Sequence, residues 1–316
     1  MKTFTRELQL AVTEYLGLIA VLSGLVLVFG LVSPSFFTPT TLRTIANQIP
    51  DALIIAVGMT LVLIVGGIDL SVGSVLALSG SVLGVSLVRW NFSLPASIAL
   101  CLATGVICGL LNGWMMTRWN LPSFIVTLGM LEIARGGAYL ITRSQTQYIG
   151  EPVERISEIN VAGISLPFIF AVGLVVVAQI TLMKTSFGRH LMACGANPEA
   201  LHLSGIDPKP VWMIVFALCG VLTSLAAVFH CSRLSAADPN SGSGFELQAI
   251  AAVVIGGTSL LGGRGSVISS FLGVLIIAVL GAGLAQMGAQ EPTKRVVTGC
   301  VIVAAVVVDH YRHAQR

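Results

Sequence analysis

The feature that most constrains this chain is the apolar run from Ala52 to Val88, which contains a single charged side chain, Asp69. A continuous helix of this length would measure about 55 Å, whereas the hydrocarbon core of a bilayer is roughly 30 Å thick. Division at the two glycines just before Asp69 gives two segments, each close to the roughly 20 residues that a membrane span needs. The run therefore predicts two membrane helices joined by a turn at Asp69.

The composition is that of an integral membrane protein, because 55% of the residues are hydrophobic and 10% are charged, against about 25% charged in soluble domains. The long apolar runs predict helices and exclude an outer-membrane barrel. The net charge of +3 is too small and too scattered to indicate nucleic acid as a partner. The six cysteines show no C-x-x-C spacing, so we expect packing roles, no metal site and no cofactor.

Apolar runs and helix breakers predict an all-α, polytopic membrane protein of about ten transmembrane helices, with residues 1–316 forming one transmembrane domain. The expected helices cover residues 15–32, 51–68, 70–88, 95–117, 122–141, 165–183, 211–230, 247–262, 266–287 and 294–308. An even number of spans puts both termini on one side of the membrane. A small excess of Lys and Arg in the loops on that side predicts that both termini are cytoplasmic.

Asp69 has two interpretations. As the residue before a helix, it can accept hydrogen bonds from the first helical turn, where Ser71 lies, and its charge suits the positive end of the helix dipole. As an ionisable residue within the membrane, it is also a candidate for a gate or a transport pathway. The structural interpretation is favoured, and the pathway interpretation stays open for both residues.

Glu132 and Arg135 fall near the middle of the helix expected at 122–141. Their i,i+3 spacing puts both on one helical face, where they can neutralise each other. A structural pair and a pair that lines a transport pathway are both consistent with this pattern. In either case, we expect that face to avoid lipid.

Asn112 accompanies Gly105, Gly109 and Gly113, which form two overlapping G-x-x-x-G steps in one expected helix. This pattern lets another backbone approach closely and predicts helix packing. Because Asn112 is polar within a membrane span, it is also kept as a candidate pathway residue.

The loop at about 184–210 is expected on the cytoplasmic side and contains a short helix with signals at both ends. Asn197 can cap a helix that begins at Pro198, and Gly205 can end it in the left-handed conformation. Such a helix can merely order the loop or can dock a soluble partner. Exposed Leu201 and Leu203, together with Ala200, would favour a partner groove.

Several stretches together resemble the ribose-type sugar permeases, the membrane subunits of bacterial ABC importers for monosaccharides. The stretches are "SPSFFTPTTL" at 33–42, "AVGMTLVLIVGGIDLSVGSVLALSG" at 56–80, "FIVTLGML" with the Arg135-Gly136 pair, "GRHLMACGANPEALHLSGI" at 188–206 and "GFELQAIAAVVIGGTSLLGGRGS" at 244–266. The resemblance covers nearly the whole chain. It departs from the pattern at Glu132, where an apolar residue is expected.

The resemblance implies a multi-pass protein of the bacterial inner membrane that forms the passage for a monosaccharide, with ribose as the sugar in the family's name. It implies a homodimer of permease chains, a cytoplasmic ATP-binding subunit with two fused nucleotide-binding domains, and a periplasmic sugar-binding protein. The expected contacts with the ATP-binding subunit are Gly188, Arg189, Gly195, Asn197, Pro198, Glu199, Ala200, Leu201, Leu203 and Gly205.

The chain itself has no G-x-x-x-x-G-K-[ST] phosphate-binding loop, so we expect a transport subunit and not an enzyme. One alternative is a secondary sugar transporter or channel that needs no ATPase and uses intramembrane ionisable groups. Another is an intramembrane hydrolase using a serine of "NSGSGF" with His230, although no orienting carboxylate is evident for that histidine.

Overall fold

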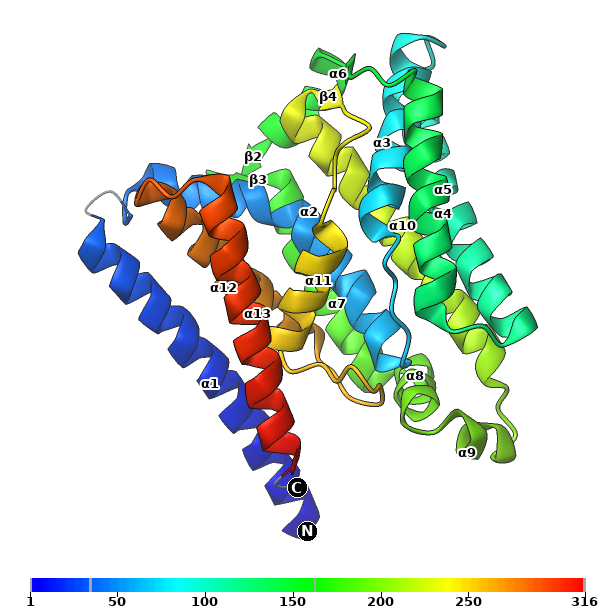
Figure 1. The fold of residues 1–316 in the computed structure, drawn as a ribbon, viewed down its shortest axis with the longest axis vertical. Coiled ribbons are helices and arrows are strands. Elements are labelled where there is room, and N and C mark those ends of the chain that lie inside the picture. Colours follow the sequence, from blue (N-terminus) through cyan, green and yellow to red (C-terminus); the bar gives the residue numbers. More distant parts are fainter. Residues whose placement is uncertain (1, 34–35, 162, 315–316) are drawn as a thin grey trace.

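The computed structural model describes residues 2–33, 36–161 and 163–314 and is built almost entirely of helices (Figure 1). The helices are α1 (Lys2–Val32), α2 (Pro39–Ile64), α3 (Val72–Val88), α4 (Leu94–Trp119), α5 (Ser123–Thr142), α6 (Glu151–Glu158), α7 (Leu166–Lys184), α8 (Ser186–Ala196), α9 (Pro198–Leu203), α10 (Pro208–Leu234), α11 (Phe245–Ile255), α12 (Val267–Gln286) and α13 (Glu291–Ala314). The short strands are β1 (Gln147–Tyr148), β2 (Asn160–Val161), β3 (Ile164–Ser165) and β4 (Ala236–Ala237).

Each expected span has a helix at its position, which confirms a polytopic helical membrane protein. Within the described residues, seven helices are long and apolar enough to cross a membrane: α1, α2, α4, α5, α7, α10 and α12. Helices α3 and α11 are shorter, with 17 and 11 residues, and the later side chains of the span expected at 294–308 lie outside those described. By this criterion seven of the expected spans are found among the described residues, and the count of ten stays a prediction.

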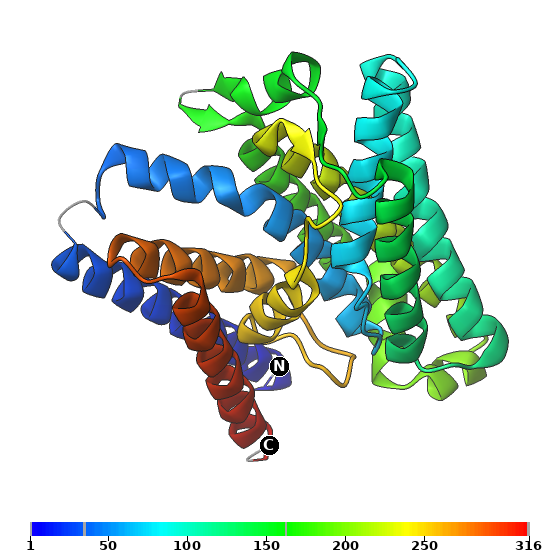
Figure 2. The same ribbon diagram turned by 45° about the horizontal axis from the view of Figure 1, so that its top comes forward.

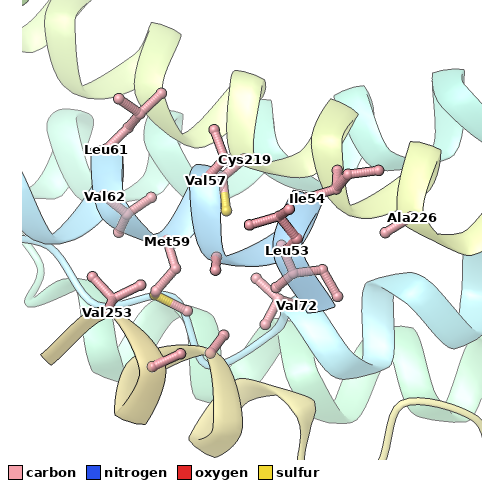
Figure 3. Packing of buried hydrophobic residues seen from close by; sticks show 14 of the residues in the cluster. Leu53, Ile54, Val57, Met59, Leu61, Val62, Val72, Cys219, Ala226 and Val253 are labelled. Atoms are coloured by element: carbon pink, nitrogen blue, oxygen red, sulfur yellow. The ribbon is translucent and has the colours of Figure 1, made fainter. Parts of the chain in front are cut away.

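Helix α2 lies at the centre of the molecule and packs against α7, α10, α11 and α12. Its C-terminal half is apolar on every side, so it has no polar face to turn toward water. Leu53, Ile54 and Val62 are fully buried there, and Figure 3 shows them between Cys219 of α10 and Val253 of α11. Helices α3, α4 and α5 gather on one side of α2, and α1, α12 and α13 gather on the other (Figure 2).

The glycines of α4 let its backbone approach the backbone of α10 closely, as their spacing predicts. A Cβ at Gly105 would collide with the carbonyl oxygen of Gly220 in α10, and a Cβ at Gly109 would collide with that of Phe216. Gly220 is restricted in the same way by the carbonyl of Gly105. The packing interpretation of these glycines is therefore confirmed.

The expected helix at 247–262 is wrong at its C-terminal end. Helix α11 stops at Ile255, and the chain then turns with Gly257, Gly262 and Gly263 at positive φ. Those angles suit glycine and do not fit a helix. The apolar residues between these glycines made the loop look like part of a span. An 11-residue helix is only about 17 Å long, so α11 cannot cross the bilayer.

The two ends of the molecule carry different elements. Figure 1 places both chain ends at the same end as α8 and α9, while α6 and the β1–β4 pair lie at the opposite end. At that opposite end, Ser232 of α10 donates to the Val153 carbonyl of α6 at 2.6 Å and accepts from the backbone N–H of Ser157 at 2.9 Å. These bonds attach the loop between α5 and α7 to the helical body.

Candidate functional site

The short helix predicted in the loop at 184–210 is present as α9. The Asn197 side chain accepts a hydrogen bond from the Ala200 N–H at 2.9 Å, and Pro198 occupies the first turn. Gly205 follows the helix with a φ of 90° and donates its N–H to the His202 carbonyl. Because both ends are fixed by local hydrogen bonds, α9 is an ordered projection beyond the helical body.

The exposed surface of α9 differs from the expected one at a single residue. Leu203 is 83% exposed and Ala200 is also exposed, as predicted. Leu201, expected on the surface, is only 6% exposed and belongs to the hydrophobic core. The reason is geometric, because neighbouring residues of a helix face different directions and Leu201 is the one that anchors α9 to the body. Asn197, Pro198 and Glu199 are exposed as well.

Helix α8 connects α9 to the centre of the molecule through backbone contacts. A Cβ at Gly195 would collide with the carbonyl oxygen of Ile64, the last residue of α2. The same carbonyl accepts the N–H of Gly263 at 2.8 Å. Three segments distant in sequence therefore meet here: α8, the end of α2 and the glycine turn before α12.

The remaining predicted residues of α8 have distinct environments. Gly188 is buried against the Leu182 carbonyl of α7, and its N–H donates to the side chain of Thr185 at 3.2 Å. Arg189 is exposed and donates to the Ser186 hydroxyl at 3.1 Å. Glycine is thus needed where α8 folds back on α7, and the exposed charge remains available to a partner.

Asp69, Ser71 and Asn112 are brought together in the interior. The Asp69 carboxylate accepts from both the N–H and the hydroxyl of Ser71, at 2.9 and 2.6 Å. The Asn112 side chain of α4 donates to that hydroxyl at 3.1 Å. Asp69 is only 2% exposed, so the three residues form a buried chain of hydrogen bonds rather than a cavity wall in this conformation.

The expectation that Asp69 caps the next helix is wrong in detail. Helix α3 begins at Val72 and its N-cap residue is Ser71, so Asp69 orders the turn before the helix instead of binding the N–H groups of its first turn. The backbone around it is not helical and needs other partners. Ser123 of α5 accepts from the Ile68 N–H at 2.9 Å, and Thr127 of α5 accepts from the Leu70 N–H at 3.1 Å. Non-helical backbone at membrane depth persists only where it is paired in this way.

Glu132 and Arg135 do not neutralise each other, which corrects the expected pair. Arg135 instead donates to the carbonyls of Pro239 and Ser241, at 2.7 and 2.8 Å. Glu132 is exposed on α5, and among the described residues no ion pair joins it to Arg135. The carbonyls of the irregular segment between α10 and α11 lack helical partners, and the arginine supplies donors to two of them.

Sequence reasoning missed a buried ionic cluster that joins α2 to α10. Asp51 lies within α2, and its carboxylate contacts the Nδ1 atom of His230 at 2.7 Å and the guanidinium of Arg233 at 2.9 Å. The sequence showed no carboxylate that could orient His230, and the structure supplies one, Asp51. Among the described side chains, no serine hydroxyl is hydrogen-bonded to His230, so the arrangement a hydrolase needs is not formed. No local sequence pattern indicates this cluster, because Asp51 lies 179 positions from His230.

The structure thus defines a polytopic helical membrane protein: a helical body, non-helical segments within it and an ordered projection at one end. Residues 41–306 match the family described as the permease component of the branched-chain amino acid transport system, and the chain belongs to this family. The ribose import permease protein RbsC of Escherichia coli (strain K12) is 39% identical over 303 residues, covering 94% of each chain.

Two further relatives carry other sugars in their names. The D-allose transport system permease protein AlsC of Escherichia coli (strain K12) is 36% identical and covers 93% of this chain and 90% of its own. The L-arabinose ABC transporter permease protein AraH of Azospirillum brasilense is 34% identical and covers 93% and 89%. The resemblance to sugar permeases inferred from the quoted stretches is confirmed.

Proposed function

We propose that this chain forms the passage for a monosaccharide in an ATP-driven importer of the bacterial inner membrane. The observation that carries the proposal is that relatives named for ribose, allose and arabinose align with almost the whole chain. The family description names branched-chain amino acids, but these relatives are sugar permeases. A pentose or hexose is therefore favoured as the substrate, with ribose first.

The energy for transport must come from a partner, because the sequence contains no phosphate-binding loop of the G-x-x-x-x-G-K-[ST] type. We place a cytoplasmic ATP-binding subunit, with two fused nucleotide-binding domains, on α9 and the exposed part of α8. Ala200 and Leu203 supply apolar contact, and Arg189 and Glu199 supply charge. A groove that receives a short helix of this kind is a common mode of protein recognition.

The contact at Gly195 supports a mechanism for coupling. A displacement of α8 presses on the Ile64 carbonyl and on the Gly263 turn, because no side chain lies between these backbones to absorb it. The first contact leads into α2 and the second into α12. Force is transmitted through contiguous packed structure, so both helices would tilt together when the ATP-binding subunit closes.

The surface of α5 supports a homodimer. Glu132 is exposed beside Ile125 and Ile133, and a carboxylate facing lipid at the centre of a span costs about 3 kcal/mol on insertion scales. A Cβ at Gly129 or Gly136 would meet nothing within 4 Å, so another backbone can approach there. A second copy packed along α5 would remove Glu132 from lipid.

The buried residues Asp69, Ser71 and Asn112 are proposed to order the turn from which α3 begins, rather than to contact sugar directly. The periplasmic binding protein is placed at the opposite end of the molecule from α9, over α6 and the β1–β4 pair. Both proposals follow from the orientation in which α8, α9 and the two termini are cytoplasmic.

The direct test is reconstitution in proteoliposomes with the cognate ATP-binding subunit and binding protein. Labelled ribose, arabinose, allose and leucine are offered in turn, with and without ATP. ATP-dependent accumulation of a sugar is expected. Equal uptake without the ATP-binding subunit would favour a secondary transporter, and uptake of leucine alone would reject the sugar assignment.

The docking of α9 is tested with a matched pair of variants. Ala200→Glu introduces a charge at the third residue of α9 and should abolish co-purification of the ATP-binding subunit and lower sugar uptake. Ala96→Glu introduces the same charge at the third residue of α4, which is exposed at the opposite end of the molecule, and should leave co-purification intact. Normal co-purification with Ala200→Glu would remove α9 from the mechanism.

A further inference from the structure

A cavity of about 710 Å³ lies within this single chain, between α2, α11, α12 and α13. It is bounded by residues 40–55 of α2, the beginning of α11, the second half of α12 and the first turns of α13. These parts lie toward the end of the molecule opposite α8 and α9 (Figure 1). The volume falls in the range of roughly 300–1,000 Å³ that small-molecule sites occupy.

Two glutamine side chains reach this cavity from different helices, Gln48 from α2 and Gln248 from α11. Both are exposed, and among the described residues neither amide is hydrogen-bonded to another protein group. Gln286 lines the same cavity, but its amide is already hydrogen-bonded to the hydroxyls of Thr41 and Ser33, at 2.7 and 3.0 Å. Gln286 therefore serves the structure, whereas Gln48 and Gln248 are available to a ligand.

The rest of the lining suits a neutral ligand with many hydroxyl groups. Thr44 and Thr298 add hydroxyls. The Thr44 hydroxyl donates to the Thr40 carbonyl at 2.9 Å and so offers a ligand its acceptor side. The charged groups of the cavity lie together on α13, where the Glu291 carboxylate contacts Lys294 at 3.6 Å and Arg295 at 3.9 Å. With two cations beside it, this carboxylate gives the described lining no net negative charge to attract the ammonium group of an amino acid.

Phe245 gives the cavity one aromatic wall, and its position is fixed from behind. The ring lies edge to face with His230, with centroids 5.7 Å apart and planes at 90°. His230 is in turn held by Asp51. An aromatic face that is fixed before binding can cover the C–H face of a sugar ring at little entropic cost.

We propose that this cavity is a resting site for the transported monosaccharide within one permease chain, with the Gln48 and Gln248 amides as its hydrogen-bonding groups. The proposal rests on the sugar-import function and names the place in the chain where the sugar is held. The hydroxyls of the ligand bind the two amides, and its ring lies along Phe245. The apolar residues of the cavity lining are compatible with an uncharged ligand.

The test uses the complete transporter in proteoliposomes and compares the double variant Gln48→Ala/Gln248→Ala with Asn47→Ala. Asn47 is exposed on the same helix but does not line the cavity. Loss of the two amides should reduce sugar uptake at limiting substrate by about tenfold or more, while the ATPase activity stimulated by loaded binding protein remains. Asn47→Ala should transport like the parent protein.

A second measurement does not depend on the transport rate. Cys300 is the exposed cysteine among those described, so Gln48→Cys is made in a Cys300→Ser background and labelled with a small thiol reagent. Sugar-loaded binding protein with trapped ATPase should slow the labelling, and Asn47→Cys should show no such protection. Unchanged uptake in the double variant together with unprotected labelling would overturn the proposal. Protection by leucine instead of sugar would overturn the assigned ligand class. Failure of the parent protein to transport any sugar would instead refute the proposed function.

Discussion

Removal of the Asp51 carboxylate is the sharpest available test of how α2 is joined to α10. In Asp51→Ala, the guanidinium of Arg233 and the ring of His230 lose the group that holds them at 2.9 and 2.7 Å. Asp51 is almost fully buried and α2 is the central helix, so water can reach the unpaired groups only from the partly exposed side of Arg233. The variant should therefore fold less stably, and its loss of stability should come from the uncompensated cation.

The magnitude follows from burial. Removing one partner of a buried ion pair costs about 3–5 kcal/mol. The Arg233 side chain is 31% exposed, which lets it regain part of its hydration, so we expect about 3 kcal/mol, the lower end of that range. Asp51→Asn keeps an oxygen acceptor and should cost about 1–2 kcal/mol. At roughly 2–4 °C per kcal/mol for a large domain, Asp51→Ala should lower the apparent melting temperature by about 6–12 °C.

The assay is the loss of the monodisperse peak of detergent-purified protein after heating, measured by size-exclusion chromatography. Arg155→Ala is the control, because the Arg155–Glu151 pair has side chains that are 73% and 83% exposed and exposed pairs contribute little. Adding Arg233→Ala to Asp51→Ala should restore part of the stability, since it removes the unpaired cation. If Asp51→Ala melts like Arg155→Ala, or if the second change only adds damage, the cluster does not join these helices as described.

Three further outcomes are expected. Gly195→Val should assemble poorly or lose coupling of ATP hydrolysis to uptake, measured as the ratio of the two rates, because its side chain would displace the end of α2; full coupling would contradict this contact. Arg135→Leu should lower the amount of folded protein in membranes by leaving two carbonyls without donors, whereas Glu132→Gln should leave that amount unchanged. Equal losses in both variants would instead support an ion pair between Glu132 and Arg135. Asp69→Asn should retain transport because one oxygen still accepts from Ser71, whereas Asp69→Leu should lower protein levels; loss of transport in Asp69→Asn at normal levels would make the charge itself essential.

The features that were predicted correctly depend on neighbours in sequence. Helix α9 was located because Asn197, Pro198 and Gly205 act within a few residues of one another. The packing of α4 was predicted because small residues spaced four apart lie on one face of a helix whatever they contact. The partner helix, α10, could not be named from the pattern, since the contact is set by the fold.

The errors arose where distant contacts decide the structure. Helix α2 was expected to begin at residue 51 because the preceding segment is polar and contains Pro50, but α2 begins at Pro39 and some of those polar residues line the large cavity. Asp51 is 179 positions from His230, so no local pattern reveals their pairing. Arg135 prefers carbonyls more than a hundred residues away to the carboxylate one turn from it, because those carbonyls have no helical partners.

Helix α2 links the proposed sugar site to the proposed coupling face. Its N-terminal half supplies Thr44 and Gln48 to the cavity, and its last residue, Ile64, contacts α8. The helix has 26 residues and is therefore about 39 Å long, so one packed element reaches from the cavity to the face where α9 projects. Asp51 attaches α10 to this element between its two ends. A tilt imposed at Ile64 would pass along α2 toward the cavity wall, and Pro50 within the helix is the position at which α2 can bend. Closure by the ATP-binding subunit would in this way change the shape of the sugar site, although no residue contacts both that subunit and the sugar.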